Sequence, residues 1–140
     1  MNQSIVSRNI IKAFKVELKT AVGIVIDKDG NLLLGRSTAD DDRKGKWCFP
    51  GGGIKKGESV LQAAIRETYE ETGILCAPVK LITVTHPIKP SVGFCVLLAK
   101  TTEIDFNEEY SDMKWFSSLP KGTMSMNNDI LELIKWKQNP

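Results

Sequence analysis

The sequence predicts an α+β fold, an α/β/α sandwich in which a mixed β-sheet lies between two main helices. Several short segments have the apolar, β-branched pattern of strands, and turn residues separate them. Two longer segments repeat apolar residues at helical spacing, one in the middle of the chain and one near its end. Strands with interspersed helices favour this layered architecture. The 140 residues contain no repeat or linker, so we expect a single domain over residues 1–140.

The expected strands are short and apolar. They cover residues 18–27, 32–34, 47–49, 75–85, 92–100 and 113–116. Gly30 and Asn31 provide turn chemistry between the first two strands, which predicts a hairpin. The third strand is expected to stop at a glycine-rich loop over residues 51–53, and the last follows an acidic loop over residues 104–112.

The central helix is expected over residues 59–72, where sequence signals mark both ends. Ser59 is an N-cap residue with Gln62 three positions later, as in a capping box, and Gly73 is a C-cap residue. The face expected to pack on the sheet contains Val60, Leu61, Ala64 and Ile65. The acidic face is therefore expected to point outward, into a cleft.

The final helix is expected to begin with Ser125 or Asn127 as its N-cap. Its expected buried face contains Ile130, Leu131, Leu133, Ile134 and Trp136.

Composition excludes several classes of protein. The net charge of +2 is too small to indicate a nucleic-acid or membrane partner, and no run approaches the ~18 apolar residues of a membrane span. Cys48, Cys76 and Cys95 are far apart and lack metal-finger spacing, which predicts reduced, buried thiols. The first 15 residues lack a signal-peptide core. We therefore expect a soluble cytoplasmic protein.

Three glutamates of the central helix share one face. Glu67, Glu70 and Glu71 stand at positions i, i+3 and i+4, Glu58 lies at the helix entrance, and Arg66 is the only cation in the helix. Carboxylates that converge in a partly buried site repel one another, and a bound Mg²⁺ or Mn²⁺ removes this cost. An ordinary solvated acidic face is the alternative for the glutamates considered alone.

The loop before the helix favours a phosphate site over a solvated face. The glycines at 51–53 let a ligand approach the backbone, and Gly57 allows a second sharp turn. Lys55 and Lys56 lie within reach of phosphates near the carboxylates. Cation, lysines and exposed backbone together suit phosphoryl chemistry.

These residues resemble the conserved box of the Nudix hydrolase family. The family pattern is a Gly, five residues, a Glu, seven residues, then Arg-Glu, an aliphatic residue, any residue, Glu-Glu, any residue, Gly and an aliphatic residue. The matching residues are Gly52, Glu58, Arg66, Glu67, Glu70, Glu71, Gly73 and Ile74. Thr68 departs from the pattern at an aliphatic position. The order of strands and helices around the box is also similar to the family's α/β/α sandwich.

The resemblance implies a role for each acidic residue in the box. Metal ligands would be Glu67, Glu70, Glu71 and the carbonyl of Gly51, with Mg²⁺ or Mn²⁺ as the cofactor. Arg66 is similar to the arginine that orients a box glutamate, and Glu58 would bind metal through water or position a neighbour. The implied reaction is attack of a metal-activated water on a pyrophosphate phosphorus.

The general base is a separate question, because the resemblance implies either a box glutamate or one from a distal loop. Here the acidic loop offers Glu109, with Glu108 and Asp112 nearby. Solvated loop charges are the alternative interpretation.

Substrate contacts are predicted from residues outside the helix. Arg36 would meet a phosphate or ribose and Trp47 would stack on a base, alongside Lys55 and Lys56. A surface arginine and a core tryptophan are the alternatives. His86 is the only histidine and is expected in a surface turn, since one histidine cannot build a zinc site.

The leading hypothesis is a Mg²⁺-dependent hydrolase that cleaves the pyrophosphate linkage of a nucleoside triphosphate or nucleotide sugar. The runner-up is an ADP-ribose or dinucleoside polyphosphate pyrophosphatase; Pro90, sixteen residues after Ile74, is a weak hint of the former. From another class comes a Nudix domain that senses a nucleotide without cleaving it. The expected partner is a small-molecule nucleotide, and a homodimer is left open because family members are often dimers.

Overall fold

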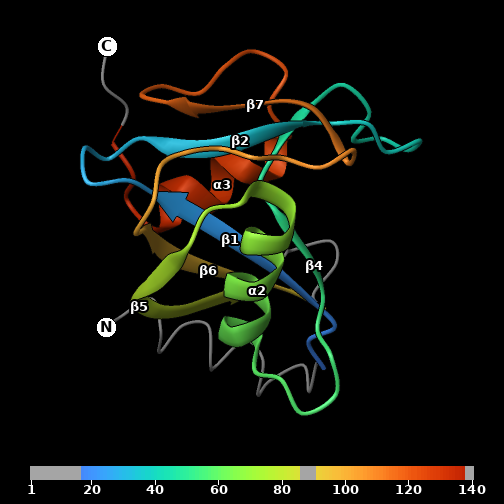
Figure 1. The fold of residues 1–140 in the computed structure, drawn as a ribbon, viewed down its shortest axis with the longest axis vertical. Coiled ribbons are helices and arrows are strands. Elements are labelled where there is room, and N and C mark those ends of the chain that lie inside the picture. The colour runs from blue at the N-terminus through green and yellow to red at the C-terminus, as the bar shows by residue number, and fades with distance from the viewer. Residues whose placement is uncertain (1–16, 86–90, 138–140) are drawn as a thin grey trace.

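The computed structural model describes residues 17–85 and 91–137 (Figure 1). The elements in chain order are β1 Thr20–Ile26, β2 Leu32–Ser37, β3 Trp47–Cys48, β4 Gly51–Gly53, α2 Val60–Thr72, β5 Cys76–Thr85, β6 Val92–Ala99, β7 Tyr110–Phe116 and α3 Ser125–Leu133. The predicted turn with His86 and Pro90 lies outside the described residues. Within them, no helix is long and apolar enough to cross a membrane.

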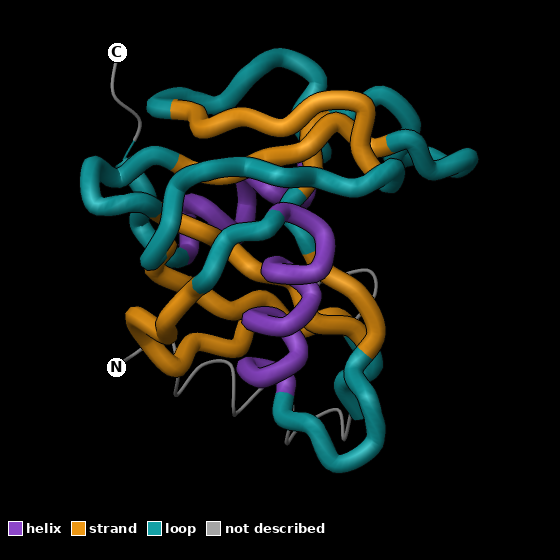
Figure 2. Tube along the Cα trace, viewed as in Figure 1, coloured by secondary structure: helices purple, strands orange, loops and turns teal. Residues whose placement is uncertain are grey.

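The strands form one mixed, seven-stranded sheet in the order β3-β2-β1-β6-β5, with β4 paired to β1 and β7 paired to β2. β1 and β6 run parallel, and the other pairs are antiparallel. The two helices lie on opposite faces of this sheet (Figures 1 and 2). This arrangement confirms the predicted α+β sandwich with a mixed sheet and two main helices.

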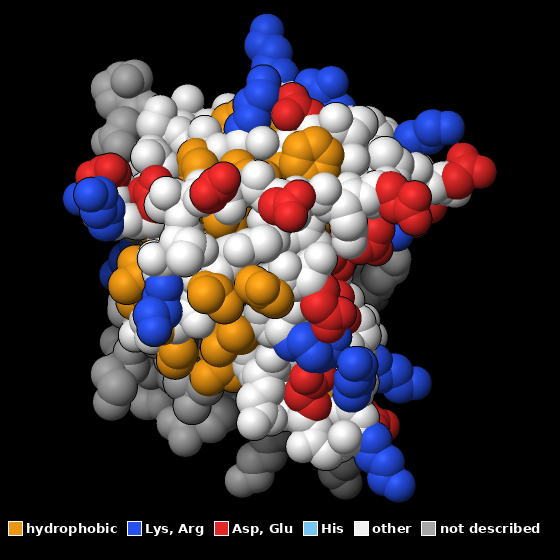
Figure 3. Space-filling model, in the orientation of Figure 1, with side chains coloured by type: hydrophobic (Ala, Val, Ile, Leu, Met, Phe, Trp, Pro, Cys, Tyr) orange, Lys and Arg blue, Asp and Glu red, His pale blue; other side chains and the backbone are white. Residues whose placement is uncertain are grey.

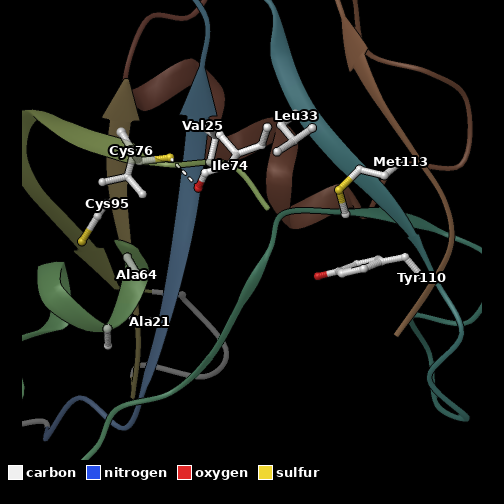
Figure 4. Close-up of a cluster of buried hydrophobic side chains, with 11 residues drawn as sticks. Ala21, Val25, Leu33, Ala64, Ile74, Cys76, Cys95, Tyr110 and Met113 are labelled. Atoms are coloured by element: carbon white, nitrogen blue, oxygen red, sulfur yellow. Dashed lines mark hydrogen bonds between the residues drawn. The ribbon is translucent and has the colours of Figure 1, made fainter. Parts of the chain in front are cut away.

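Each face of the sheet has its own hydrophobic core. Ala63 and Ala64 of α2 pack with Val25, Leu33 and other buried residues on one face (Figure 4). Ile130 and Leu131 of α3 pack on the other face. The rest of that second cluster consists of Ile24, Leu32, Leu34, Trp47, Phe49, Phe94 and Val96. All three cysteines lie in the described part of the chain, and none of them forms a disulfide.

The predicted ends of α2 are confirmed. The Ser59 side chain accepts from the Gln62 backbone at 3.1 Å, and the Gln62 side chain accepts from the Ser59 backbone at 2.8 Å. Gly73 ends the helix with a left-handed φ of 73°. The outward acidic face is only partly correct, because Glu71 is 3% exposed and packs inward.

Two predictions for the first half of the sheet need correction. The glycine-rich segment is a strand and not a loop: β4 runs beside β1, and a Cβ at Gly51 would lie 2.5 Å from the Ala21 carbonyl oxygen. The expected β1–β2 hairpin is reduced to the pair Ile26 and Leu32. The remainder of β1 pairs instead with β4 and β6, which lie on either side of it.

The C-terminal predictions were also partly wrong. β7 begins at Tyr110, three positions before the predicted strand, because its pairing with β2 extends to Ser37. The N-cap of α3 is Met124, with no side-chain cap, so neither Ser125 nor Asn127 has that role. Leu133, the last residue of α3, is 39% exposed, whereas Ile134 and Trp136 pack against the second core as predicted.

One buried hydroxyl in α2 lacks a hydrogen-bond partner among the described residues. It belongs to Thr68, which is fully buried beneath β1, where a Cβ at Gly23 would lie 2.6 Å from its Oγ1. Thr72, equally buried one turn later, donates to the Thr68 carbonyl at 2.6 Å and accepts from the Ile74 N–H at 3.1 Å.

We therefore expect opposite effects from the same substitution at these two threonines. Thr68→Val should raise the free energy of unfolding by about 1 kcal/mol, since it removes an unsatisfied buried hydroxyl. Thr72→Val should lower it by about 1–2 kcal/mol, since it leaves the Ile74 N–H without its acceptor. Urea unfolding at equilibrium measures both. Equal destabilisation would mean that the Thr68 hydroxyl has a partner, such as a buried water.

Candidate active site

The glycine strand gives the site its backbone surface. β4 lies between β1 and the acidic side of α2, and a Cβ at Gly52 would come within 2.5 Å of the Glu67 carboxyl carbon. The Glu67 carboxylate therefore rests directly against bare main chain. Only glycine leaves room for this contact.

Arg66 holds three carboxylates together. Its guanidinium donates to Glu58 through Nε at 2.7 Å and Nη2 at 2.9 Å. Nη1 donates at 2.8 Å to both Glu67 and Glu70, and Nη2 also donates to the Gly53 carbonyl at 2.9 Å. Figure 3 shows acidic and basic side chains side by side along the edge of the molecule next to α2. Such forked, charge-assisted bonds fix orientation as well as distance.

The same network keeps Glu58 ionised. The hydrogen bonds from Arg66, followed by the backbone N–H of Lys55 at 3.0 Å, lower the pKa of Glu58 to about 2. These carboxylate bonds also raise the pKa of Arg66. Glu58 is thus an anion at neutral pH, and it binds Nε and Nη2 of the guanidinium while Glu67 and Glu70 bind Nη1.

Glu71 is in a different environment, since it is buried and its hydrogen-bond partners in residues 17–85 and 91–137 include no arginine. The Tyr110 hydroxyl donates to its Oε1 at 2.6 Å, and the Gly51 N–H donates to the same oxygen at 3.3 Å. Burial is the main cause that raises the pKa of Glu71 to about 8. The charge of Glu109 and the contact with the Glu67 carboxyl also raise this pKa, whereas the two donors lower it.

A cavity of about 260 Å³ opens beside these carboxylates. Its walls come from β1, the glycine strand, the ends of β2, β3 and β7, and the loops next to these ends. The lining residues are Thr20, Val22, Ser37, Thr38, Ala39, Arg43, Cys48, Phe49, Gly51, Gly52, Glu109 and Tyr110. Glu109 is held at its edge by Asn107, whose Nδ2 donates to Glu109 Oε2 at 3.2 Å and whose Oδ1 accepts from the Glu109 N–H at 3.0 Å.

The donor set suits a hard divalent cation. Glu67 and Glu71 are in contact, and Glu109 lies near enough for its charge to act on Glu71. Carboxylate oxygens without histidine or thiolate favour Mg²⁺ or Mn²⁺. Among the described residues, no three acidic, histidine or cysteine side chains already surround one point. Arg66 now engages Glu67 and Glu70, which a cation would share.

Of the four predicted substrate contacts, none lines the cavity. Trp47 is 5% exposed in the core, against Phe116, and the Arg36 guanidinium lies 4.8 Å from its ring centroid. The predicted base stacking by Trp47 is therefore corrected, because neither ring face is open. Arg36 covers this ring, and Lys55 and Lys56 are exposed in the turn before α2.

Several residues that line the cavity or hold its acidic groups were missed by the sequence interpretation. Tyr110 and Asn107 had no signal apart from their position beside Glu109. Arg43 lies in the polar loop after β2 and is tethered to Asp41 through a 2.7 Å ion pair. The position of Arg43 depends on that local turn, and no periodic pattern in the sequence predicts the turn. Cys48 also lines the cavity, and burial raises the pKa of its thiol to about 11.

A family model described as the NUDIX domain matches residues 17–119. The chain is similar to the 8-oxo-dGDP phosphatase of Mus musculus, with 30% identity over 133 residues, or 87% of this chain and 41% of the mouse protein. It spans 86% of the ADP-ribose pyrophosphatase of Methanocaldococcus jannaschii, which is 25% identical over 97% of this chain. The chain therefore covers less than half of the mouse relative's length.

The fold is also similar to solved structures. The crystal structure of a MutT NUDIX hydrolase from Burkholderia pseudomallei superposes with a TM-score of 0.67 and 25% sequence identity. The alignment covers 85% of this chain and 99% of that structure. The similarity thus extends across nearly the whole of that protein.

The buried Glu71 should make the stability of the cation-free protein depend on pH. Its pKa of about 8 in the folded state lies above its ordinary value of 4.5, so folding favours the protonated form. The resulting stabilisation is complete below about pH 4.5 and is lost as the pH rises through 8. The lowered pKa of Glu58 acts only at lower pH, because its contribution is lost as the pH falls from 4.5 toward 2.

We therefore expect the free energy of unfolding, measured by urea titration with a chelator present, to fall between pH 5.5 and 8.5. Glu71→Gln should flatten this slope, because the amide does not titrate. Equal slopes in the two proteins would contradict the assignment.

Proposed function

This chain belongs to the NUDIX domain family, and we propose that it is a divalent-cation-dependent pyrophosphohydrolase acting on a nucleoside triphosphate or a nucleotide sugar. The observation that carries the proposal is the contact of the Glu67 carboxylate with bare backbone at Gly52, beside the buried Glu71. Acidic groups pressed together against exposed main chain are costly unless a cation joins them. The adjoining cavity gives a substrate access to the same point.

The proposed cation is Mg²⁺ or Mn²⁺, held by Glu67, Glu70 and Glu71 with the Gly51 backbone. When bound, it would neutralise charge on the pyrophosphate oxygens and lower the pKa of the attacking water. Arg66 orients Glu67 and Glu70, and Glu58 in turn orients Arg66. The chain's own contribution is to keep these oxygens fixed before the substrate arrives.

We assign the proton acceptor to Glu109. It lines the cavity and Asn107 holds one of its oxygens, whereas Glu67 and Glu70 are both engaged by Arg66. In the reaction, the water oxygen bonds to one phosphorus and its proton passes to Glu109. The bond from that phosphorus to the bridging oxygen breaks, and two phosphorylated products leave.

The cavity is small for a whole nucleotide. At about 260 Å³ it lies just below the usual 300–1,000 Å³ range of ligand sites, so it accommodates only part of a nucleotide substrate. Arg43 at its wall is a candidate contact for a phosphate or base, and Lys55 and Lys56 would attract the remaining charge. The activities named for the mouse and archaeal relatives, on 8-oxo-dGDP and ADP-ribose, both concern nucleoside diphosphate groups. ADP-ribose is therefore the second candidate.

The first experiment is a substrate panel with phosphorus NMR detection, with and without Mg²⁺ or Mn²⁺. It contains nucleoside triphosphates, 8-oxo-dGDP, nucleotide sugars, ADP-ribose and dinucleoside polyphosphates. We expect cation-dependent cleavage of a nucleoside triphosphate or nucleotide sugar. Gly52→Ala should reduce the rate about 100-fold, since its methyl would displace the Glu67 carboxylate.

Gly53→Ala is the matched control for this panel. A Cβ at Gly53 meets nothing within 4 Å, so this protein should retain its rate. Tight nucleotide binding without turnover of any panel member would mean that the protein is a nucleotide sensor and not a hydrolase. Equal rates in the two alanine variants would mean that the contact between Gly52 and Glu67 is not part of the reaction site.

A second pair of variants tests the proton acceptor. Glu109→Gln should lower kcat by about 10²–10⁴-fold with little change in KM, because an amide cannot accept the proton. Glu108→Gln should leave both parameters close to those of the unaltered protein, since Glu108 is exposed and does not line the cavity. Steady-state kinetics across pH 6–9 measure both. Similar losses in the two variants would mean that Glu109 is a solvated loop charge and not the proton acceptor.

A further inference from the structure

Tyr110 and Glu71 make a buried contact between segments that are 39 positions apart. Tyr110 begins β7 and is 8% exposed, and its hydroxyl donates to Glu71 Oε1 at 2.6 Å. A hydrogen bond of this length to a carboxylate in a water-poor environment strongly fixes the orientation of both groups.

A second donor reaches the same oxygen from another strand. The Gly51 N–H of β4 donates to Glu71 Oε1 at 3.3 Å. Neither donor contacts Oε2. The carboxylate is therefore held through one oxygen by two strands, while its other oxygen is not used by either of them.

The Tyr110 ring is itself fixed by close packing. A Cβ at Gly35 of β2 would lie 2.4 Å from Tyr110 Cδ1 and 2.7 Å from Met113 Cε, so the ring packs against bare backbone. Figure 4 shows the ring beside Met113, with its hydroxyl pointing away from β7 toward the middle of the molecule. The ring has no room to swing, and its hydroxyl has a defined place.

We propose that Tyr110 is a positioning residue that holds Glu71 through Oε1 and thereby keeps Oε2 available to the divalent cation. This inference rests on the proposed function. The same contact joins α2 to the strand that directly follows Glu109, so it also sets the distance between the proposed proton acceptor and the cation ligands.

A neutral donor suits this task better than a charged one. A lysine or arginine beside Glu71 would compete with the cation for the carboxylate, as Arg66 engages Glu67 and Glu70. The phenol hydroxyl is uncharged at pH 7 and orients the carboxylate without neutralising it. Hydrogen bonds to metal-binding carboxylates tune affinity in this way.

The test is Mn²⁺ binding to Tyr110→Phe, followed by the electron paramagnetic resonance signal of free Mn²⁺. We expect the dissociation constant to rise 10–100-fold, with kcat largely recovered at saturating cation. Tyr69→Phe is the matched control, since Tyr69 is 52% exposed on α2 and should leave the affinity within about twofold. In a Glu71→Gln background, Tyr110→Phe should add no further loss, because it acts through Glu71.

An unchanged Mn²⁺ affinity in folded Tyr110→Phe would overturn this inference and leave the proposed function standing. Failure of the unaltered protein to bind Mn²⁺ would overturn both. An additive loss in the Glu71→Gln background would show that Tyr110 acts by another route, and would also overturn it.

A spectroscopic measurement keeps the inference testable if Tyr110→Phe does not fold. The chain has two tyrosines, so in Tyr69→Phe the tyrosine Raman doublet reports on Tyr110 alone. We expect the signature of a strong hydroxyl donor with and without Mg²⁺, and its loss in Tyr69→Phe/Glu71→Ala. Absence of that signature in the Mg²⁺-loaded protein would overturn the inference.

Discussion

The central constraint on this molecule is the concentration of negative charge along one side of α2, from Glu58 before its first turn to Glu70 and Glu71 in its last. Arg66 makes that concentration tolerable, since its five hydrogen bonds connect three glutamates and a backbone carbonyl. Each carboxylate would otherwise repel its neighbours at short range in a partly buried setting. The guanidinium compensates for the charge while keeping the oxygens in fixed directions, which a mobile counter-ion in solvent would not do.

The sheet supplies the other half of this arrangement. β4 carries no side chains, so α2 can approach it until Glu67 meets the main chain of Gly52. β1 holds β4 on one side and continues in parallel with β6 on the other, and this central position keeps the glycine strand rigid. A flexible glycine loop would not maintain such a close contact. Two of the residues that lack side chains, Gly51 and Gly52, are therefore closely packed against their neighbours.

The box helix was predictable because its signals are local. Ser59, Gln62 and Gly73 act within one turn of the helix ends, and the glutamate spacing follows from helix geometry. The fold class was predictable for the same reason, since strand and helix periods are visible in short windows. The inward position of Glu71 was not, because it depends on Tyr110, which is distant in sequence. Trp47 was misassigned because an aromatic residue before a glycine segment has the same pattern whether it stacks on a ligand or on Phe116.

One part of the cavity wall, the loop that follows β2, lies apart from the acidic cluster in the sequence, and this separation has an evolutionary consequence. The loop over residues 38–43 contributes Thr38, Ala39 and Arg43 to the wall, and none of these three is among the hydrogen-bond partners of Arg66. Exposed loops accept substitution and insertion more readily than packed strands. Selection can therefore reshape the wall while the glutamates stay unchanged, so paralogues that share one catalytic apparatus can diverge toward different nucleotides.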